Sequence, residues 1–185
     1  MAKRKSKKLT QKRTILALIL MVLSVLTICT MFMPAFSSQL NTIVGSSNKS
    51  QTTGLDVLTA CFNNSISSDF SGGANTLISL KNSDDYAFIT NVFCWAYFIT
   101  VVISGAVLIT ALLSVIKIRL KYVYMLLGAL LVFAALITFI FGFIVAGKFG
   151  YSGYLTSYNT SASVAVYLML VAIICGITEI LSANS

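Results

Sequence analysis

The sequence predicts an all-α membrane protein, an up-down bundle of four transmembrane helices with a small extracytoplasmic cap built from its loops. Two observations carry this prediction. Of the 185 residues, 57% are hydrophobic and only 10% are charged, whereas a soluble globular domain carries roughly 25% charged residues. The apolar residues also fall into four long blocks, and a helix of about 20 such residues crosses a hydrocarbon core of ~30 Å.

The first apolar block runs from Thr14 to Met33, after a basic tail, and Pro34, the only proline, closes it. A cleaved signal peptide is the alternative, because the start is basic and Ala35-Phe36-Ser37 resembles a small-x-small cleavage site. The apolar stretch is longer than the usual 7–15 residues of such a peptide. We therefore expect this block to be retained as the first helix.

The first polar segment, residues 37–85, is rich in Ser, Asn, Thr and Gly and holds four of the five acidic residues. Leu40–Val44 and Thr76–Leu80 alternate in the manner of strands, and the apolar positions between Leu55 and Ile66 fit a short amphipathic helix. About 50 residues are marginal for an independent core. The segment is therefore either a small ordered cap or a loose loop.

The second apolar block is longer than a bilayer requires, so we expect it to tilt or to project. Aromatic residues crowd its outer end, as in an interfacial belt. The whole chain divides into a basic tail (1–13), helix 1 (14–36), the cap (37–85), helix 2 (86–116), a basic turn (117–121), helix 3 (122–146), a second loop (147–160), helix 4 (161–181) and a short tail (182–185).

The basic residues predict the orientation. With four spans, the N-terminal tail and the 117–121 turn lie on one side of the membrane, and they hold ten of the thirteen Lys and Arg. The two polar loops on the other side hold only Lys49, Lys81 and Lys148. Loops rich in Lys and Arg stay in the cytoplasm. We expect a multi-pass plasma-membrane protein with both termini cytoplasmic. The formal charge of +8 thus points to lipid headgroups and not to nucleic acid.

The residue inventory argues against catalysis. The chain contains no histidine, which removes the usual general base and metal ligand. Its four cysteines form no CxxC pair, and no phosphate-binding glycine loop or nucleophile elbow is present. We expect no enzyme activity, no cofactor and no metal. A membrane enzyme would need a partner or cofactor to supply the missing base.

Ionisable residues inside membrane spans are functional candidates. Spans one to three contain no Asp, Glu, Lys or Arg, and Glu179 lies near the cytoplasmic end of span four. We interpret it as an interfacial carboxylate that reaches water or pairs with Lys117, Arg119 or Lys121. Lys148 is expected to snorkel at the outer edge of span three. A proton-coupled transporter would need a titrating group near the midplane, which this pattern does not supply.

Small residues recur every four positions in span three and form a ridge on one face. Such ridges let helix backbones approach closely in lipid. The ridge packs either the protein's own helices or another membrane protein. In span two, the hydroxyls of Thr100, Ser104, Thr110 and Ser114 drift around the helix and do not line one stripe. The ridge comprises Ala134, Thr138, Gly142 and Ala146.

Cysteines and loop aromatics supply the remaining candidates. Cys29 and Cys94 lie at similar depth in their spans and could form a disulfide, with Cys61–Cys94 as the alternative bond and buried free thiols as the third interpretation. Apolar and aromatic residues near the outer surface are suited to contacts with partners. The candidate interaction residues are Leu55, Asp56, Phe62, Trp95, Tyr151 and Tyr154.

The layout resembles claudin-like tetraspan proteins, which have internal termini, a large first outer loop and a small second loop. The first loop of claudins carries a tryptophan-rich motif and a pair of cysteines. The first loop of this chain lacks that motif and holds a single cysteine, Cys61. It is also similar to small uncharacterised four-span proteins of Gram-positive bacteria, through Gly54-Leu55-Asp56-Val57-Leu58 and Gly153-Tyr154-Leu155. The resemblance implies a four-helix layout and no particular activity.

These features predict a non-enzymatic scaffold or accessory protein that acts through its outer loop and helix faces. Its partners would be the lipid bilayer and other membrane proteins or further copies of itself. The alternative is a small transporter or channel, formed as an oligomer because four spans rarely enclose a pathway alone.

Overall fold

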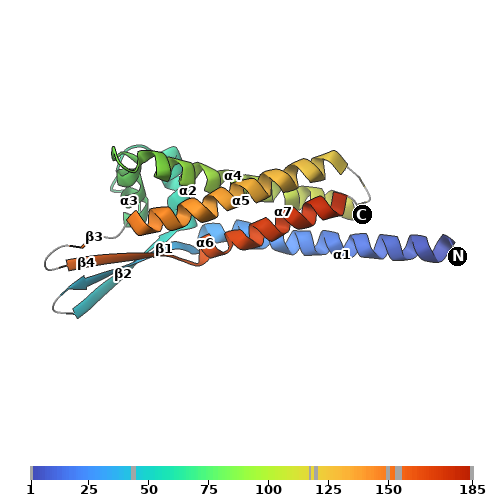
Figure 1. The fold of residues 1–185 in the computed structure, drawn as a ribbon, viewed down its shortest axis with the longest axis horizontal. Helices are drawn as coiled ribbons and strands as arrows, with labels where there is room; N and C mark the ends of the chain where they lie inside the picture. Colours follow the sequence, from blue (N-terminus) through green and yellow to red (C-terminus); the bar gives the residue numbers. More distant parts are fainter. Residues whose placement is uncertain are drawn as a thin grey trace.

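The computed structural model describes residues 2–42, 45–116, 118, 121–148, 151–152 and 156–183, and the side chains of residues 14–38, 51–116, 118, 121–148 and 160–183. Long helices run side by side along the molecule, and a sheet extends from one end of them (Figure 1). Both chain termini lie toward the opposite end. These ends are named the cap end and the terminal end below.

The bundle contains four helical segments long and apolar enough to cross a membrane, as predicted. In the first, helix α1 continues through the basic segment expected as a tail, and a 3-10 turn, η1, follows it. Met33 is extended, as a residue before proline prefers, and the helix ends there. The elements are α1 (Ala2–Cys29) with η1 (Thr30–Phe32), α4 (Ala87–Val115), α5 (Lys121–Lys148), and α6 (Val164–Tyr167) followed by α7 (Met169–Ala183).

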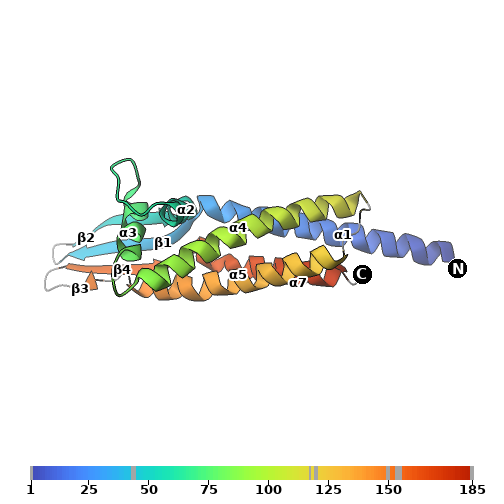
Figure 2. The ribbon, with the colours of Figure 1, turned by 90° about the horizontal axis from the view of Figure 1, so that it is seen from above.

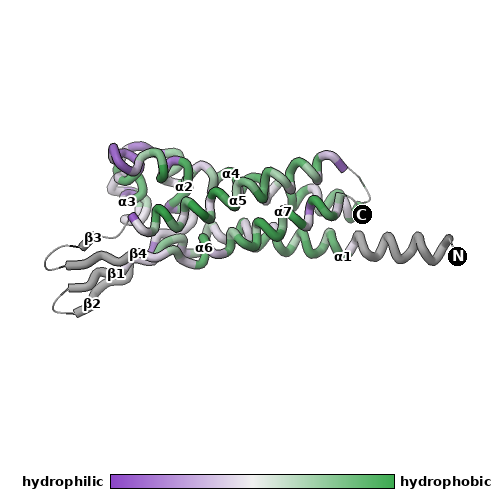
Figure 3. Tube along the Cα trace, viewed as in Figure 1, coloured by the Kyte–Doolittle hydropathy of each residue, from purple (hydrophilic) through white to green (hydrophobic). Residues whose placement is uncertain are grey.

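The four spans form a closed ring. Each packs against two neighbours in the order α1, α4, α5, α7, and α7 returns to contact α1. Successive spans run in opposite directions (Figure 2). Large apolar side chains are also exposed on the outside of the bundle, for example Val22, Phe133 and Ile174. Hydrophobic residues predominate along the coloured part of the four spans (Figure 3). Such a surface is suited to lipid.

The two polar loops join in one antiparallel sheet. Its strand order is β2-β1-β4-β3, and the ladder between β1 and β4 runs from Phe36 opposite Ala162 to Thr42 opposite Thr156. Ile43 and Val44, in the strand expected over Leu40–Val44, lie outside the described residues. The strands are β1 (Pro34–Thr42), β2 (Gly45–Thr53), β3 (Tyr151–Ser152) and β4 (Thr156–Ala162).

Two short helices complete the cap. Helix α2 (Gly54–Phe62) forms within the predicted 55–66 segment, and α3 spans Gly72–Lys81. The strand expected over Thr76–Leu80 was therefore wrong. Ala74, Leu77, Ile78 and Lys81 are all buried, which is the three- and four-residue spacing of a helix face.

One core connects the cap to the spans. It contains Phe36 of β1, Val57 of α2, Leu77 of α3, Phe93 of α4 and Met169 of α7, each with its side chain fully buried. The first loop is therefore an ordered cap seated on the bundle. A second cluster, which includes Leu20, Val107 and Leu131, fills the bundle toward the terminal end.

Candidate functional site

The small-residue ridge of α5 faces the protein's own interior. Ala134, Thr138, Gly142 and Ala146 are all buried. A Cβ added at Gly142 would lie 2.9 Å from a Val166 methyl and 3.3 Å from the Phe93 ring. The ridge therefore packs α5 against α4 and α6, which supports the internal alternative over an interface with another protein.

Helices α5 and α7 cross most closely at two glycines. A Cβ added at Gly128 would lie 2.6 Å from the carbonyl oxygen of Gly176, and a Cβ at Gly176 would lie 2.6 Å from that of Gly128. Backbones approach this closely only where neither residue has a side chain. This crossing fixes the position of α7, which carries Glu179.

Asp56, one of the candidate interaction residues, forms hydrogen bonds within the cap. Its Oδ2 accepts the backbone N–H of Thr53 at 2.7 Å, and the Thr53 hydroxyl accepts the N–H of Asp56. Its Oδ1 accepts the hydroxyl of Ser71, which caps α3 through the N–H of Ala74. One carboxylate thus joins the N-terminal ends of α2 and α3.

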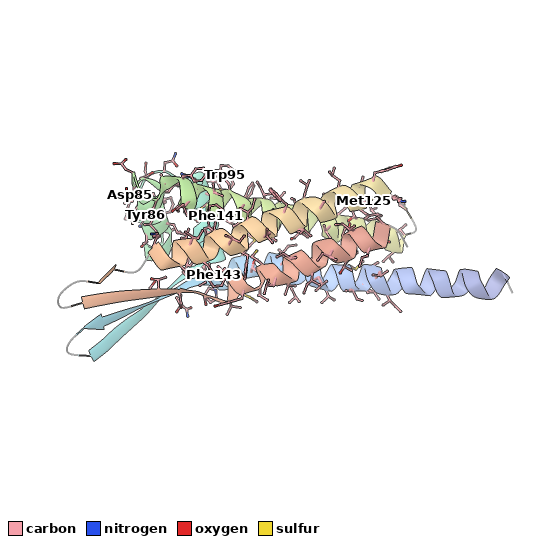
Figure 4. The ribbon with its side chains drawn as sticks, in the orientation of Figure 1. Asp85, Tyr86, Trp95, Met125, Phe141 and Phe143 are labelled. Atoms are coloured by element: carbon pink, nitrogen blue, oxygen red, sulfur yellow. The ribbon has the colours of Figure 1, made fainter. Side chains whose placement is uncertain are left out.

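An aromatic cluster formed by Phe62, Trp95 and Phe98 lies on the outside of the molecule. Phe62, at the end of α2, contacts both α4 aromatics edge to face, with ring centroids 5.8 Å from Trp95 and 5.0 Å from Phe98. Phe62 is 60% exposed and Trp95 45%, and Figure 4 shows Trp95 on α4 toward the cap end. Leu55, also in α2, is 43% exposed.

The tyrosines of the second loop are only partly described. Tyr151 begins β3, where its backbone pairs with Tyr158 of β4, and Tyr154 lies outside the described residues. Nearby, the Lys148 ammonium lies 5.4 Å from the centre of the Tyr86 ring, a cation–π distance. Lys148 thus packs against an aromatic residue at the cap end of the bundle, where Figure 4 labels Tyr86.

All four cysteines are free thiols. Neither the candidate disulfide between Cys29 and Cys94 nor the alternative Cys61–Cys94 bond is formed, and Cys94 is fully buried in α4. Outside the spans, burial raises the pKa of Cys61, and the nearby Lys81 ammonium partly offsets this rise. These thiols behave as small apolar residues.

Lys81 is a buried cation that the sequence analysis did not single out. Its Nζ donates to the carbonyl oxygens of Ala60 at 2.9 Å, Cys61 at 3.0 Å and Asn63 at 3.3 Å. These carbonyls end helix α2, where the helix dipole favours a positive charge. The sequence offered one signal of this burial: in a helix, Lys81 follows Ala74 by seven residues and so lies on the same face.

Glu179 is fully buried, contrary to the interfacial position expected for it. The Thr110 hydroxyl of α4 donates to its Oε1 at 2.8 Å. Its Oε2 has no hydrogen-bond partner in the described part of the chain. Lys117 and Arg119, two of the expected ion-pair partners, lie outside the described residues.

Buried hydroxyls connect the helices elsewhere. Thr100, Ser104 and Thr110 of α4 are all buried, and Ser114 is half-buried. Thr100 and Thr110 contact different helices, α5 and α7. Thr100 and Thr138 lie 3.3 Å apart between α4 and α5, and Thr30 and Tyr97 lie 3.1 Å apart between η1 and α4. Each threonine also donates to a carbonyl of its own helix or turn. They therefore act mainly as interhelical packing groups.

Among the described residues, no group of three or more His, Cys, Asp or Glu side chains is close enough to hold a metal ion. Comparison with known proteins finds no matching family model, no matching curated protein and no matching solved structure. The likeness to claudin-like and small bacterial four-span proteins therefore rests on layout and short motifs.

Proposed function

We propose that this chain is a non-enzymatic membrane scaffold or accessory subunit that binds a partner membrane protein through the aromatic cluster and the adjoining surface of α2. The observation that carries the proposal is an exposed aromatic group whose rings are held against one another by edge-to-face contacts. Such rigid, amphipathic side chains are frequent binding hot spots.

The surrounding surface fits the same role. Leu55 of α2, Ile66 in the turn between α2 and α3, and Phe88 in the first turn of α4 are 43%, 63% and 75% exposed. Asp56 and Lys81 hold α2 at both ends, so Phe62 is presented from a fixed helix. A pre-organised surface loses less entropy on binding than a mobile loop does.

The proposed placement is the plasma membrane, with the termini in the cytoplasm and the cap outside. The basic N-terminal segment lies at the terminal end, as do the end of α4 and the start of α5, which the 117–121 segment joins. The N-terminal segment and residues 117–121 together hold ten of the thirteen Lys and Arg. This distribution supports that orientation. Partner binding would then occur at the outer edge of the membrane.

The experiment is affinity purification from native membranes in a mild detergent, followed by mass spectrometry and size determination. A stoichiometric partner is expected, and its recovery should fall about tenfold or more in Phe62→Ala and Trp95→Ala, since hot-spot truncation costs ~2 kcal/mol or more. Phe133→Ala is the matched control because Phe133 is 65% exposed on α5, outside the cluster. Equal recovery from all three variants, or purification of the chain alone, would count against the proposal.

A small oligomeric transporter or channel is the second candidate, favoured by Glu179 and the inward-facing hydroxyls. The hydroxyl protons are largely engaged by backbone carbonyls, which argues for packing. Ion and proton flux into vesicles containing the reconstituted protein tests this candidate. A flux that Glu179→Gln abolishes would favour it over the scaffold.

A further inference from the structure

Glu179 is the most isolated ionisable group in the described bundle. It lies in α7, one turn before the end of that helix, and none of its surface is exposed. It receives one hydrogen bond, from Thr110, and its Oε2 receives none from the described residues. A buried carboxylate normally needs an opposite charge or several donors.

Among the side chains that the structure describes, those contacting or nearest to Glu179 are neutral. From α4 comes the Thr110 hydroxyl, and from α5 comes Tyr124, whose hydroxyl lies 3.1 Å from the carbonyl oxygen of Thr110. One turn earlier in α7 is the Cys175 thiol, which in turn lies 3.6 Å from the Ser24 hydroxyl of α1. Lys121, at the start of α5, is exposed, and no described basic side chain forms an ion pair with Glu179.

We propose that Glu179 is a proton-binding site, a neutral carboxylic acid at pH 7 inside the bundle. Oε1 is the carbonyl oxygen that accepts from Thr110, and Oε2 carries the proton. A single hydroxyl does not offset the loss of water around a charged carboxylate in an apolar interior, so the group binds a proton instead. A metal cation is the weaker alternative, because the site offers few oxygen ligands.

Tyr124 marks the side from which the proton enters. Its side chain is 5% exposed, and its hydroxyl reaches the carbonyl oxygens of both Thr110 and Ile118, the latter in the turn at the terminal end. The Tyr124 hydroxyl thus links the backbone of Thr110, the residue that binds Glu179, to Ile118 of the turn. Protons therefore exchange with the terminal-end side, which is the cytoplasm in the proposed orientation.

The test uses the fact that Glu179 is the chain's only glutamate. The full protein is produced with glutamate ¹³C-labelled at the side-chain carboxyl, purified, and reconstituted in phosphatidylcholine–phosphatidylglycerol vesicles. Solid-state NMR then reports the protonation of this one carboxyl between pH 4 and 9. An ordinary glutamate would be protonated to roughly 0.2% at pH 7. We expect more than half, an increase of about 250-fold.

Two variants sharpen the measurement. Glu179→Gln should remove the titrating signal and confirm its assignment. Thr110→Val removes the one donor to Oε1 among the described residues and should move the titration midpoint upward, because that bond favours the charged form. Thr138→Val is the matched control, since it deletes a buried hydroxyl that contacts Thr100 and not Glu179. It should leave the midpoint unchanged.

An ionised Glu179 at pH 7 would overturn the proposal. Ionisation in both sodium and choline buffers would indicate pairing with a basic residue, and ionisation in sodium buffer alone would indicate a cation site. The inference is independent of the proposed scaffold role. Whether Glu179 is neutral or ionised at pH 7 does not change the result expected for partner binding by the Phe62 and Trp95 variants.

Discussion

At the scale of single residues, Gly54 lies where the cap approaches the first span most closely. A Cβ at this position would overlap the Tyr97 hydroxyl and lie 2.6 Å from the Thr30 carbonyl oxygen. Gly54→Ala is therefore expected to destabilise the protein by about 1–3 kcal/mol, because overpacking forces dense neighbours apart. The measurement is the thermal unfolding midpoint in detergent, followed by the fluorescence of Trp95, the only tryptophan.

The control for this change is Gly105→Ala in the middle of α4. An added Cβ there meets nothing within 4 Å, and alanine favours a helix by up to ~1 kcal/mol over glycine. Its midpoint should be unchanged or higher. Equal losses in both variants would show that Gly54 has no special packing requirement.

Lys81 gives a second prediction at this scale. Lys81→Met keeps the apolar stem and removes the ammonium that binds three carbonyl oxygens. We expect a loss of about 1–3 kcal/mol, the usual penalty for leaving buried polar groups unpaired. Lys148→Met, in which only an exposed ammonium beside Tyr86 is lost, should change the unfolding midpoint little. A large fall in the unfolding midpoint of both variants would indicate that the lost positive charge, and not the three contacts of Lys81, causes the destabilisation.

At the scale of elements, Asp56 makes the stability of α2 depend on that of α3. Asp56→Ala should loosen both helices, because the carboxylate takes part in both N-terminal caps and each cap is worth about 0.5–2 kcal/mol. Hydrogen exchange detected by mass spectrometry should show faster exchange over both Gly54–Phe62 and Gly72–Lys81. Asp69→Ala, on the exposed turn between them, is the control. Faster exchange in α2 alone would contradict the shared cap.

The short elements show where sequence patterns fail. Within segment 72–81, residues Thr76–Leu80 alternate well enough to suggest a strand, yet Ser71 caps a helix there. Strand β4, TSYNTSA, is mostly polar and gives no alternating apolar signal. It forms because β1 supplies its backbone hydrogen bonds across the two loops. Such long-range pairing is not encoded in local composition.

At the scale of the whole molecule, the predictable features are those that the bilayer imposes. Four apolar spans, one of them separated from the next by a long polar loop, fix a bundle from length and composition. The sites depend instead on how spans rotate about their axes. That rotation buries Glu179 and directs the α5 ridge inward, and it follows from close contacts such as Gly128 against Gly176, which composition alone does not define.

Orientation is a whole-molecule property that can be tested directly. In a variant without the native cysteines, Ser65→Cys places a thiol on the exposed turn between α2 and α3, and Ser6→Cys places one in the basic start of α1. A membrane-impermeant maleimide added to intact cells should label the first and leave the second unlabelled until the membrane is permeabilised. Labels in the reverse pattern would place the cap in the cytoplasm.

The distribution of basic residues is the reason to expect an external cap and cytoplasmic termini, and changing these residues should weaken that preference. Seven basic residues precede the first span, and three more lie in the 117–121 turn, so both connections at the terminal end resist translocation together. Replacing all ten with glutamine should produce a mixed population in which some Ser6→Cys thiols are labelled in intact cells. If the Ser6→Cys thiols stayed unlabelled in intact cells after these substitutions, the ten charges would not determine the orientation.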